Sequence, residues 1–254
     1  MFRFKIVCIV VLALPCFHVP RRAVVGGAPV TPAALALDRE TVAGLHHYLH
    51  GYPADEPDGT VNAVIEIPSG TTAKFEVTED DGWLHWQHDR DDGALRELDY
   101  LPFPVNYGMV PRTLAADGDA LDIVVLGRGI ERGHVTGTRV IGVLKMGTDE
   151  ERDDKLIAVP VETGLTNGFS RLHDIDELDA FYPAARAILV LWFANYWGPG
   201  ATHVRGWGDA AEAVGSLEEA KRAFTRSGVA AGADRVEGAA SRPRSFLPFD
   251  ELVR

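Results

Sequence analysis

Three aspartates lie close together in the segment ADGDALD, which runs directly into the apolar stretch IVVLG. Asp117 and Asp119 are two residues apart, so in an extended segment their side chains point the same way, whereas Asp122 points to the other face of a regular strand. A turn at the small residues Gly118 and Ala120 would bring all three carboxylates around one point. Clusters that offer only oxygen suit hard cations such as Mg²⁺, Mn²⁺ or Ca²⁺. The alternative is a polar turn before a strand, because Asp and Gly are common turn residues.

Further charged side chains lie in or beside predicted strands. Glu66 sits in the middle of the apolar segment VNAVIEI, where a charge costs free energy unless it is paired or exposed. In the next predicted strand, alternation places Lys74 and Glu76 on one face, opposite Phe75. The acidic run TDEERDDK at residues 148–155 joins two Val- and Ile-rich segments, and taken alone it is typical of a solvated hairpin loop. Each feature has an ordinary structural explanation, so only their combination indicates a binding site.

The net charge limits the class of partner. The 254 residues carry a formal charge of −12 at pH 7, which argues against nucleic acid or an anionic membrane, because phosphate groups require a basic surface. An acidic protein still binds a polyanion when metal ions mediate the contact. With 46% hydrophobic residues the chain can bury a substantial core, and its length indicates one or two domains.

Histidine spacing and the known catalytic motifs give no second candidate for chemistry. His46, His47 and His50 have a spacing reminiscent of metal ligands on a helix, although a surface cluster is the simpler interpretation. The chain contains no GxSxG, HExxH or P-loop motif, so hydrolysis through an enzyme nucleophile and nucleotide switching lack support.

The N-terminal segment has the pattern of an export signal. Arg3 and Lys5 precede an apolar run over residues 6–17, which is shorter than the roughly 20 residues that a membrane-spanning helix needs. Small residues at 23–28 offer a cleavage site, so we expect residues 1–28 to be a signal peptide and the mature protein to be periplasmic or secreted, without membrane attachment. An uncleaved anchor and a mis-assigned start codon are the alternatives, and the second would leave the protein cytoplasmic. Both cysteines lie in this segment, so the mature chain would have no disulfide.

The rest of the chain divides into a linker, a run of short strands and two late helices. Residues 29–60 are predicted to be an N-terminal linker or extension, with a short helix over 38–50. Helices are predicted over 176–196 and 209–226, and residues 227–254 form a tail that is low in bulky side chains. Strands are predicted at 61–67, 72–78, 83–89, 94–101, 123–127, 139–146 and 155–161. Short strands with small interruptions favour a closed barrel or a compact sheet.

Four segments occur in the order seen in soluble family I inorganic pyrophosphatases. They are VIEIPSGTTAKFEV, DYLPFPVNYGMVPRTLAADGDALDIVVLG, GVLKMGTDEERDDKLIAVP and a late NYW. The most specific part is the pattern PxNYGxxPxTxxxDGDxxD. The chain therefore resembles this family, and the resemblance implies an α+β, mainly β catalytic domain over 61–226: a five-stranded OB-like closed barrel flanked by C-terminal helices. It also implies Mg²⁺-dependent hydrolysis of diphosphate to two phosphates, with Mn²⁺ or another divalent cation as a substitute.

The resemblance also assigns the first metal ion and the base. Asp117, Asp122 and Asp149 match ligands of the first metal ion, and Asp122 is shared with the second. Asp119 looks like the family's general base, next to the water that bridges the two metal ions.

The remaining assignments concern the substrate. The metal ions that arrive with diphosphate would be held by Asp149, Asp153 and Glu66. Glu76 is similar to a supporting acid in the second strand. The donors that would face the phosphates are Lys74, Arg96, Tyr107, Lys155 and Tyr196.

Two departures from the family pattern affect the rim of this site. Phe103 stands where the family usually has a tyrosine, and Trp197 stands where it has a lysine. One alternative is therefore a non-catalytic metal-binding relative on the same scaffold. Another is an enzyme shifted to larger diphosphates, with Trp197 stacking on an organic group.

Two assignments have rivals within the sequence. The acidic loop is one residue shorter than in the commonest pattern, so Glu150 competes with Asp149, and Arg90 competes with Arg96. Dimers and hexamers are common among members of the family, so a homo-oligomer is consistent with the resemblance.

Overall fold

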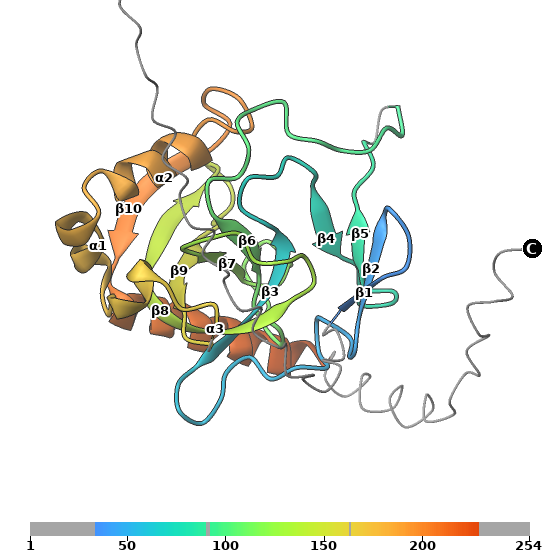
Figure 1. Ribbon diagram of the computed structural model, residues 1–254, viewed down its shortest axis with the longest axis horizontal. Helices are drawn as coiled ribbons and strands as arrows, with labels where there is room; N and C mark the ends of the chain where they lie inside the picture. The colour runs from blue at the N-terminus through green and yellow to red at the C-terminus, as the bar shows by residue number, and fades with distance from the viewer. Residues whose placement is uncertain (1–33, 90–91, 163, 229–254) are drawn as a thin grey trace, which may run out of the picture. The chain divides into compact units, whose positions relative to one another are not determined.

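Five strands hydrogen-bond to one another in a closed ring. In the order of pairing they are β3 (Val61–Ile67), β6 (Asn106–Met109), β7 (Asp122–Val125), β9 (Lys155–Pro160) and β8 (Val135–Gly147). β8 pairs back onto β3, and only the β7–β9 pair is parallel. This computed structural model thus confirms the expected five-stranded barrel, which lies at the centre of Figure 1.

The structure describes residues 34–89, 92–162 and 164–228. The predicted signal peptide at 1–28 and most of the predicted tail lie outside these ranges. Within them, no helix is long and apolar enough to cross a membrane.

Burial explains why the barrel strands have these sequences. All six residues of β9 are buried, because this strand lies between β7 and β8 and reads as a nearly continuous apolar run. β3 is buried except at Asn62, and its register on β6 shifts between Ile65 and Ile67. A bulge of this kind takes one side chain out of the regular alternation. Here that residue is Glu66, which explains how a carboxylate fits into an apolar strand.

A smaller sheet packs beside the barrel. It contains, in order, β1 (Ala34–Ala36), β2 (Thr41–Gly44), β5 (Leu84–Trp86) and β4 (Phe75–Val77). Tyr48, Phe75 and Leu84 are buried with Val64 and Met109 of the barrel, so one core joins the two sheets.

Two local predictions are wrong. The helix expected over 38–50 is absent, because Thr41 and Val42 pair with β5 and this pairing outweighs a weak helical pattern. The strand expected over 94–101 is reduced to isolated bridges at Leu95 and Glu97. Conversely, β6 and β10 (His203–Gly208) were not expected, since their glycines and polar residues hide the alternation on which the prediction depends.

The predicted helix over 176–196 is two helices, α1 (Ile175–Phe181) and α2 (Ala185–Phe193). Pro183 lacks the N–H that a continuous helix needs, and Ala184 has a positive φ of 67°. The chain therefore turns between them. A short 3₁₀ helix at Gly168–Arg171 precedes α1.

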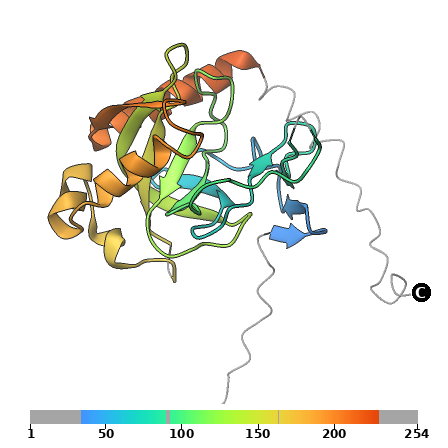
Figure 2. The same ribbon diagram turned by 90° about the horizontal axis from the view of Figure 1, so that it is seen from above.

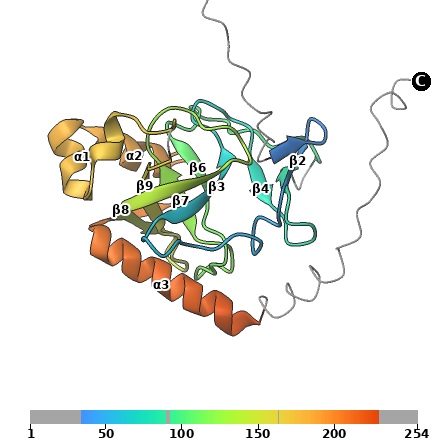
Figure 3. The same cartoon turned by 60° about the horizontal axis from the view of Figure 1, so that its bottom comes forward.

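The last predicted helix is confirmed as α3 (Ala210–Ser227). The side chain of Asp209 accepts a hydrogen bond from the N–H of Glu212 at 2.8 Å, so Asp209 is the N-cap of this helix. At the other end Gly228 has a φ of 75°, which is typical of a helix C-terminus. Figures 2 and 3 show α3 along one side of the barrel strands, with α1 and α2 against another side.

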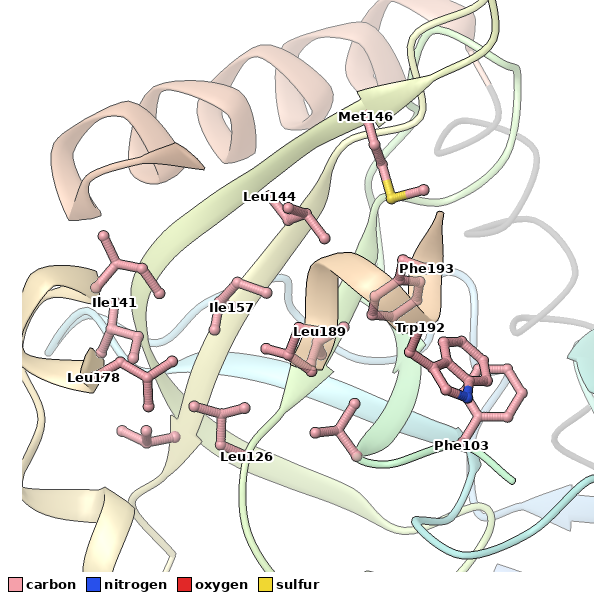
Figure 4. Close-up of a cluster of buried hydrophobic side chains, with 14 of the residues drawn as sticks. Phe103, Leu126, Ile141, Leu144, Met146, Ile157, Leu178, Leu189, Trp192 and Phe193 are labelled. Atoms are coloured by element: carbon pink, nitrogen blue, oxygen red, sulfur yellow. The ribbon is translucent and has the colours of Figure 1, made fainter. Parts of the chain in front are cut away.

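The largest apolar cluster lies between the barrel and these first two helices. Figure 4 shows Leu189 of α2 toward Ile157 of β9, with Phe103 beside Trp192. The ring centroids of Phe103 and Trp192 are 4.5 Å apart, and Phe103 is buried. A second cluster joins the barrel to α3 through Ala213, Leu217 and Ala220. The barrel is thus supported on two sides, which fixes the strand ends that carry the polar residues.

Candidate active site

The loop that precedes β7 holds Asp117 and Asp119 in a tight turn. The N–H of Asp119 donates to Oδ1 of Asp117 at 3.0 Å, and the N–H of Ala115 donates to the carbonyl oxygen of Asp119 at 2.7 Å. Gly118 has a φ of 92°, a conformation that strains any residue with a side chain. The expected turn at Gly118 is therefore confirmed, and it ends where Asp122 begins β7. We refer to residues 115–121 as the DGD loop.

A buried lysine connects three of the predicted site residues. Nζ of Lys155, whose side chain is 1% exposed, lies 2.6 Å from Oδ2 of Asp122 and 2.8 Å from Oδ1 of Asp153. It also donates to the hydroxyl of Tyr107 at 3.4 Å. Burial opposes the charge of Lys155, but the two carboxylates outweigh this effect and raise its pKa. Lys155 is therefore positively charged throughout the neutral range.

Glu66 is the most deeply buried carboxylate of the site. Its Oε1 accepts a hydrogen bond from the N–H of Val77 at 3.0 Å, which links β3 to β4. Burial and then the charge of Asp122 raise the pKa of Glu66 well above its ordinary value. A positive charge placed beside Glu66 would reverse that shift.

Two further carboxylates of the site, Asp119 and Asp153, also have raised pKa values. Burial, followed by the charge of Asp117, raises the pKa of Asp119. Burial also raises the pKa of Asp153 to about 6, although Lys155 opposes it. Like charges that lie close together are costly unless a cation joins them. The group therefore has the electrostatics of a cation site.

Two more cations stand at the edge of this group. Nζ of Lys74 lies 2.6 Å from Oε1 of Glu76, so strand alternation places them together as expected. The ring centroid of Trp197 is 5.1 Å from Nζ of Lys74 and 4.3 Å from Cζ of Arg96. Arg90, the rival to Arg96, lies outside the described residues.

A cavity of about 1020 Å³ collects most of the predicted residues. Lys155 is not among its lining residues, but it binds two that are, Asp122 and Asp153. Those of the predicted residues that line the cavity are Glu66, Lys74, Glu76, Tyr107, Asp117, Asp119, Asp122, Asp153 and Tyr196.

Asp149 and Arg96 do not line this cavity. The side chain of Asp149 is 93% exposed, and its nearest basic partner is His203, at 3.6 Å. The cause is a tight turn in which the N–H of Thr148 donates to the carbonyl oxygen of Glu151 at 2.9 Å, leaving Asp149 at the tip. Glu151, from the same loop, does line the cavity.

The donors were tested for their fit to a metal ion. They are carboxylate oxygens, which hard divalent cations prefer. Within the described ranges, however, no three Asp, Glu, His or Cys side chains stand together in the arrangement of a formed metal site. Lys155 instead supplies the positive charge nearest to Asp122 and Asp153. The donor chemistry therefore fits a hard cation, and binding would require these side chains to adjust.

Several lining residues were missed in the sequence. Glu151 was overlooked because its loop matches the family pattern imperfectly. His47 and His50 were interpreted as a surface cluster, yet both line the cavity, and their rings stack at 3.6 Å between centroids. Their proximity to the DGD loop depends on contacts between distant segments, which no local pattern records.

Comparison with known proteins agrees with this geometry. The sequence model of the family described as inorganic pyrophosphatase matches residues 63–225, well over half of the chain. This chain belongs to the inorganic pyrophosphatase family. It is 34% identical over 180 residues to the inorganic pyrophosphatase of Gluconobacter oxydans, covering 66% of this chain and 93% of that protein. It is 32% identical over 176 residues to the one from Saccharolobus solfataricus, covering 66% and 94%.

Solved structures of the family share the fold. The inorganic pyrophosphatase from Helicobacter pylori superposes with a TM-score of 0.57 at 30% identity, covering 68% of this chain and 95% of that chain. The one from Coxiella burnetii gives a TM-score of 0.59 at 27% identity, covering 68% and 99%. The family therefore accounts for the barrel and the two flanking helical regions, whereas residues 34–62 precede the segment matched by the family.

Proposed function

We propose that this chain hydrolyses inorganic diphosphate to two phosphate ions with the help of a divalent cation, chiefly Mg²⁺, with Mn²⁺ as a substitute. The observation that carries the proposal is the meeting of the DGD loop, Lys74 and the carboxylate partners of Lys155 in one cavity. The relatives from Gluconobacter and Saccharolobus bear the name of this activity. An acidic chain can bind this anion because cations held by its carboxylates offset the repulsion.

The cations would be held by Asp117, Asp122, Asp153 and Glu66, four of the carboxylates that line the cavity. When bound, divalent cations would neutralise the substrate and lower the pKa of the attacking water molecule. Asp119 then accepts the proton of the attacking water.

The phosphate oxygens are bound by cations and hydroxyls of the chain. Lys155 and Lys74 supply positive charge that stabilises the departing phosphate. Burial raises the pKa of Tyr107 well above its ordinary value and that of Tyr196 to about 12. Both hydroxyls therefore stay protonated at neutral pH and can donate hydrogen bonds. Arg96, which lines the neighbouring cavity and contacts Trp197, would bind a phosphate oxygen from that side.

One ligand assignment from the sequence changes in this proposal. The carboxylate that the β8–β9 loop contributes is Glu151 rather than Asp149, because Glu151 lines the cavity and Asp149 stands at the tip of the turn.

A single assay tests the proposal against its alternatives. The purified protein is given inorganic diphosphate, ADP or ATP, each with Mg²⁺ and with EDTA, and phosphate release is measured. We expect rapid release from diphosphate with Mg²⁺ only. No release from any substrate would favour the non-catalytic alternative, and preference for the nucleotides would favour the substrate-shifted one.

Phe103 bears on the non-catalytic alternative. Its ring is 3% exposed and packs between Trp192 and Tyr107, at 4.5 and 5.4 Å between centroids. It therefore belongs to the core beneath α2 and does not line the cavity. The missing hydroxyl leaves the cations and carboxylates of the cavity in place, which favours an active enzyme.

Export and self-association complete the proposal. The basic and apolar pattern of residues 1–28 supports a cleaved signal, and the resemblance supports a homo-oligomer. Sequencing the N-terminus of the protein recovered from the cell exterior or periplasm tests the first. Light scattering coupled to size-exclusion chromatography tests the second.

A further inference from the structure

Trp197 lies between two cavities. This residue is 42% exposed, and it lines both the main cavity and a second cavity of about 990 Å³. Glu76 and Tyr196 also line both cavities. Arg96 lines only the second cavity, whereas Lys74 lines only the main one. Trp197 therefore stands where the two predicted phosphate-binding cations meet.

Both cations are in contact with the indole ring. The ring centroid lies 4.3 Å from Cζ of Arg96 and 5.1 Å from Nζ of Lys74, distances at which a cation is attracted to an aromatic face. The backbones of the two basic residues are also joined, since the N–H of Lys74 donates to the carbonyl oxygen of Arg96 at 3.0 Å. The three side chains form one unit, which we call the indole clamp.

The clamp is supported from α2. Trp197 contacts the ring of Tyr196 at 5.1 Å, and Tyr196 stacks on Trp192 at 4.9 Å with nearly parallel planes. Nε1 of Trp192 donates to the carbonyl oxygen of Leu101 at 3.1 Å. The indole of Trp197 is thus the outer member of a series of ring contacts that ends in the buried core.

We propose that Trp197 is a positioning residue that holds Lys74 and Arg96 ready for diphosphate. Long basic side chains lose rotamer freedom when they bind an anion, and contact with a fixed ring removes part of that cost beforehand. The ring of Trp197 thereby compensates for the lysine that the family usually has at this position. The inference rests on the proposed function, because it names what the clamp binds. It also gives Trp197 a role other than stacking on an organic group.

The test measures substrate binding as well as turnover. Trp197→Leu removes the ring, and Trp197→Phe keeps an aromatic face. Imidodiphosphate, which resists hydrolysis, is titrated into each protein with Mg²⁺ by calorimetry, and kcat and KM are measured with diphosphate. Trp207 provides matched controls, Trp207→Leu and Trp207→Phe, because its ring lies 5.9 Å from Arg186 and lines neither cavity.

We expect Trp197→Leu to weaken imidodiphosphate binding and raise KM by about 2- to 30-fold, the range that corresponds to a cation–π contact, with a smaller change in kcat. Trp197→Phe should recover most of the loss, and the Trp207 variants should bind normally. Arg96→Met and the Arg96→Met/Trp197→Leu double variant complete a double-mutant cycle. The loss of binding free energy in the double variant should be smaller than the sum of the losses in the two single variants.

Several results would overturn the proposal. Normal binding and KM in folded Trp197→Leu would do so, and so would additive losses in the double variant. Should Trp197→Leu fail to fold, binding by Trp197→Phe that is no better than by Arg96→Met would count against the clamp. A wild-type protein that neither binds imidodiphosphate nor hydrolyses diphosphate would refute the proposed function itself, which is a separate outcome.

Discussion

Adjacent residues of the NYG segment have different tasks. Asn106 is fully buried and makes four hydrogen bonds: its Nδ2 donates to the carbonyl oxygens of Val125 and Arg128, and its Oδ1 accepts from the N–H groups of Ser69 and Ile130. Gly108 lies so close to β3 that a Cβ would fall 1.8 Å from the carbonyl oxygen of Val64. Only Tyr107, between them, faces the cavity.

Replacing Asn106 should therefore weaken the fold. In Asn106→Ala two N–H groups and two carbonyl groups lose their partners at once, and we expect a loss of about 2–4 kcal/mol in the free energy of unfolding. Urea denaturation followed by circular dichroism measures it. Asn62→Ala is the matched control, because Asn62 makes exposed hydrogen bonds and should cost less than about 1 kcal/mol. Equal losses in the two variants would contradict this explanation.

Asp119 should show the opposite behaviour. An amide cannot accept the proton of the attacking water, so we expect Asp119→Asn to lower kcat by about 10²- to 10⁴-fold. The free energy of unfolding should stay the same or rise, since burial and Asp117 already disfavour the charge at this position. Phosphate release and thermal denaturation are measured on the same sample. Near-normal hydrolysis would show that another group is the base.

At this scale the turn of the DGD loop was predictable, because Asp and Gly favour turns. Aspartates separated by a glycine gave the turn and its carboxylates. The work of Asn106 could not be predicted, because its four partners are 19 to 37 residues away along the chain and are joined only by the fold.

At the scale of elements, the β8–β9 loop determines which carboxylate enters the cavity. Gly147, with a φ of 147°, leads into the turn, and a Cβ there would fall 2.1 Å from the carbonyl oxygen of Glu151. The short loop therefore has little freedom to rearrange, so Glu151 lines the cavity and Asp149 does not.

This arrangement predicts unequal effects of two neutral substitutions. Glu151→Gln should weaken Mn²⁺ binding by about 10- to 100-fold, as loss of a metal-site residue commonly does, whereas Asp149→Asn should change it by less than about 3-fold. Calorimetric titration of each variant with Mn²⁺ in the absence of substrate measures the affinity directly. A larger effect in Asp149→Asn would restore the assignment made from the sequence.

Elements were predictable where the signal is local. α3 has a capping aspartate, a regular apolar face and a terminal glycine, and its bounds were expected to within one residue. The failures, at 38–50 and 94–101, are segments whose backbone partners lie in other elements. Pro183 indicates an interruption in the sequence, but only the positive φ of Ala184 shows that one helix ends and another begins there.

At the scale of the whole molecule, residues 34–60 are built into the catalytic domain. Tyr48 is fully buried and its hydroxyl donates to the carbonyl oxygen of Gly133 at 2.8 Å. Lys221 of α3 binds Asp55 at 2.8 Å, and although burial opposes its charge, Asp55 and Glu218 raise its pKa. This segment lies before the region matched by the sequence model of the family.

Two truncated proteins would show what this segment contributes. A chain that begins at residue 34 keeps all the strands of both sheets and should retain the thermal midpoint and activity of the longer protein. A chain that begins at residue 61 loses β1, β2 and Tyr48, and exposes the core beneath the small sheet. We expect it to unfold at least about 5 °C lower, since removal of one large buried side chain alone costs about 3 kcal/mol or more. Equal midpoints would show that the segment is dispensable.

The closed barrel was expected only through the family resemblance, because ring closure joins strands that are not neighbours in sequence. β9 completes the ring by pairing in parallel with β7 and antiparallel with β8. A growing chain on the ribosome therefore cannot assemble the site until Tyr196 has emerged, because Lys155 and Asp153 enter with β9 and the segment before it, and Tyr196 follows α2. Hydrolytic competence should thus arise in a single late step of synthesis, with no partly active fragment preceding it.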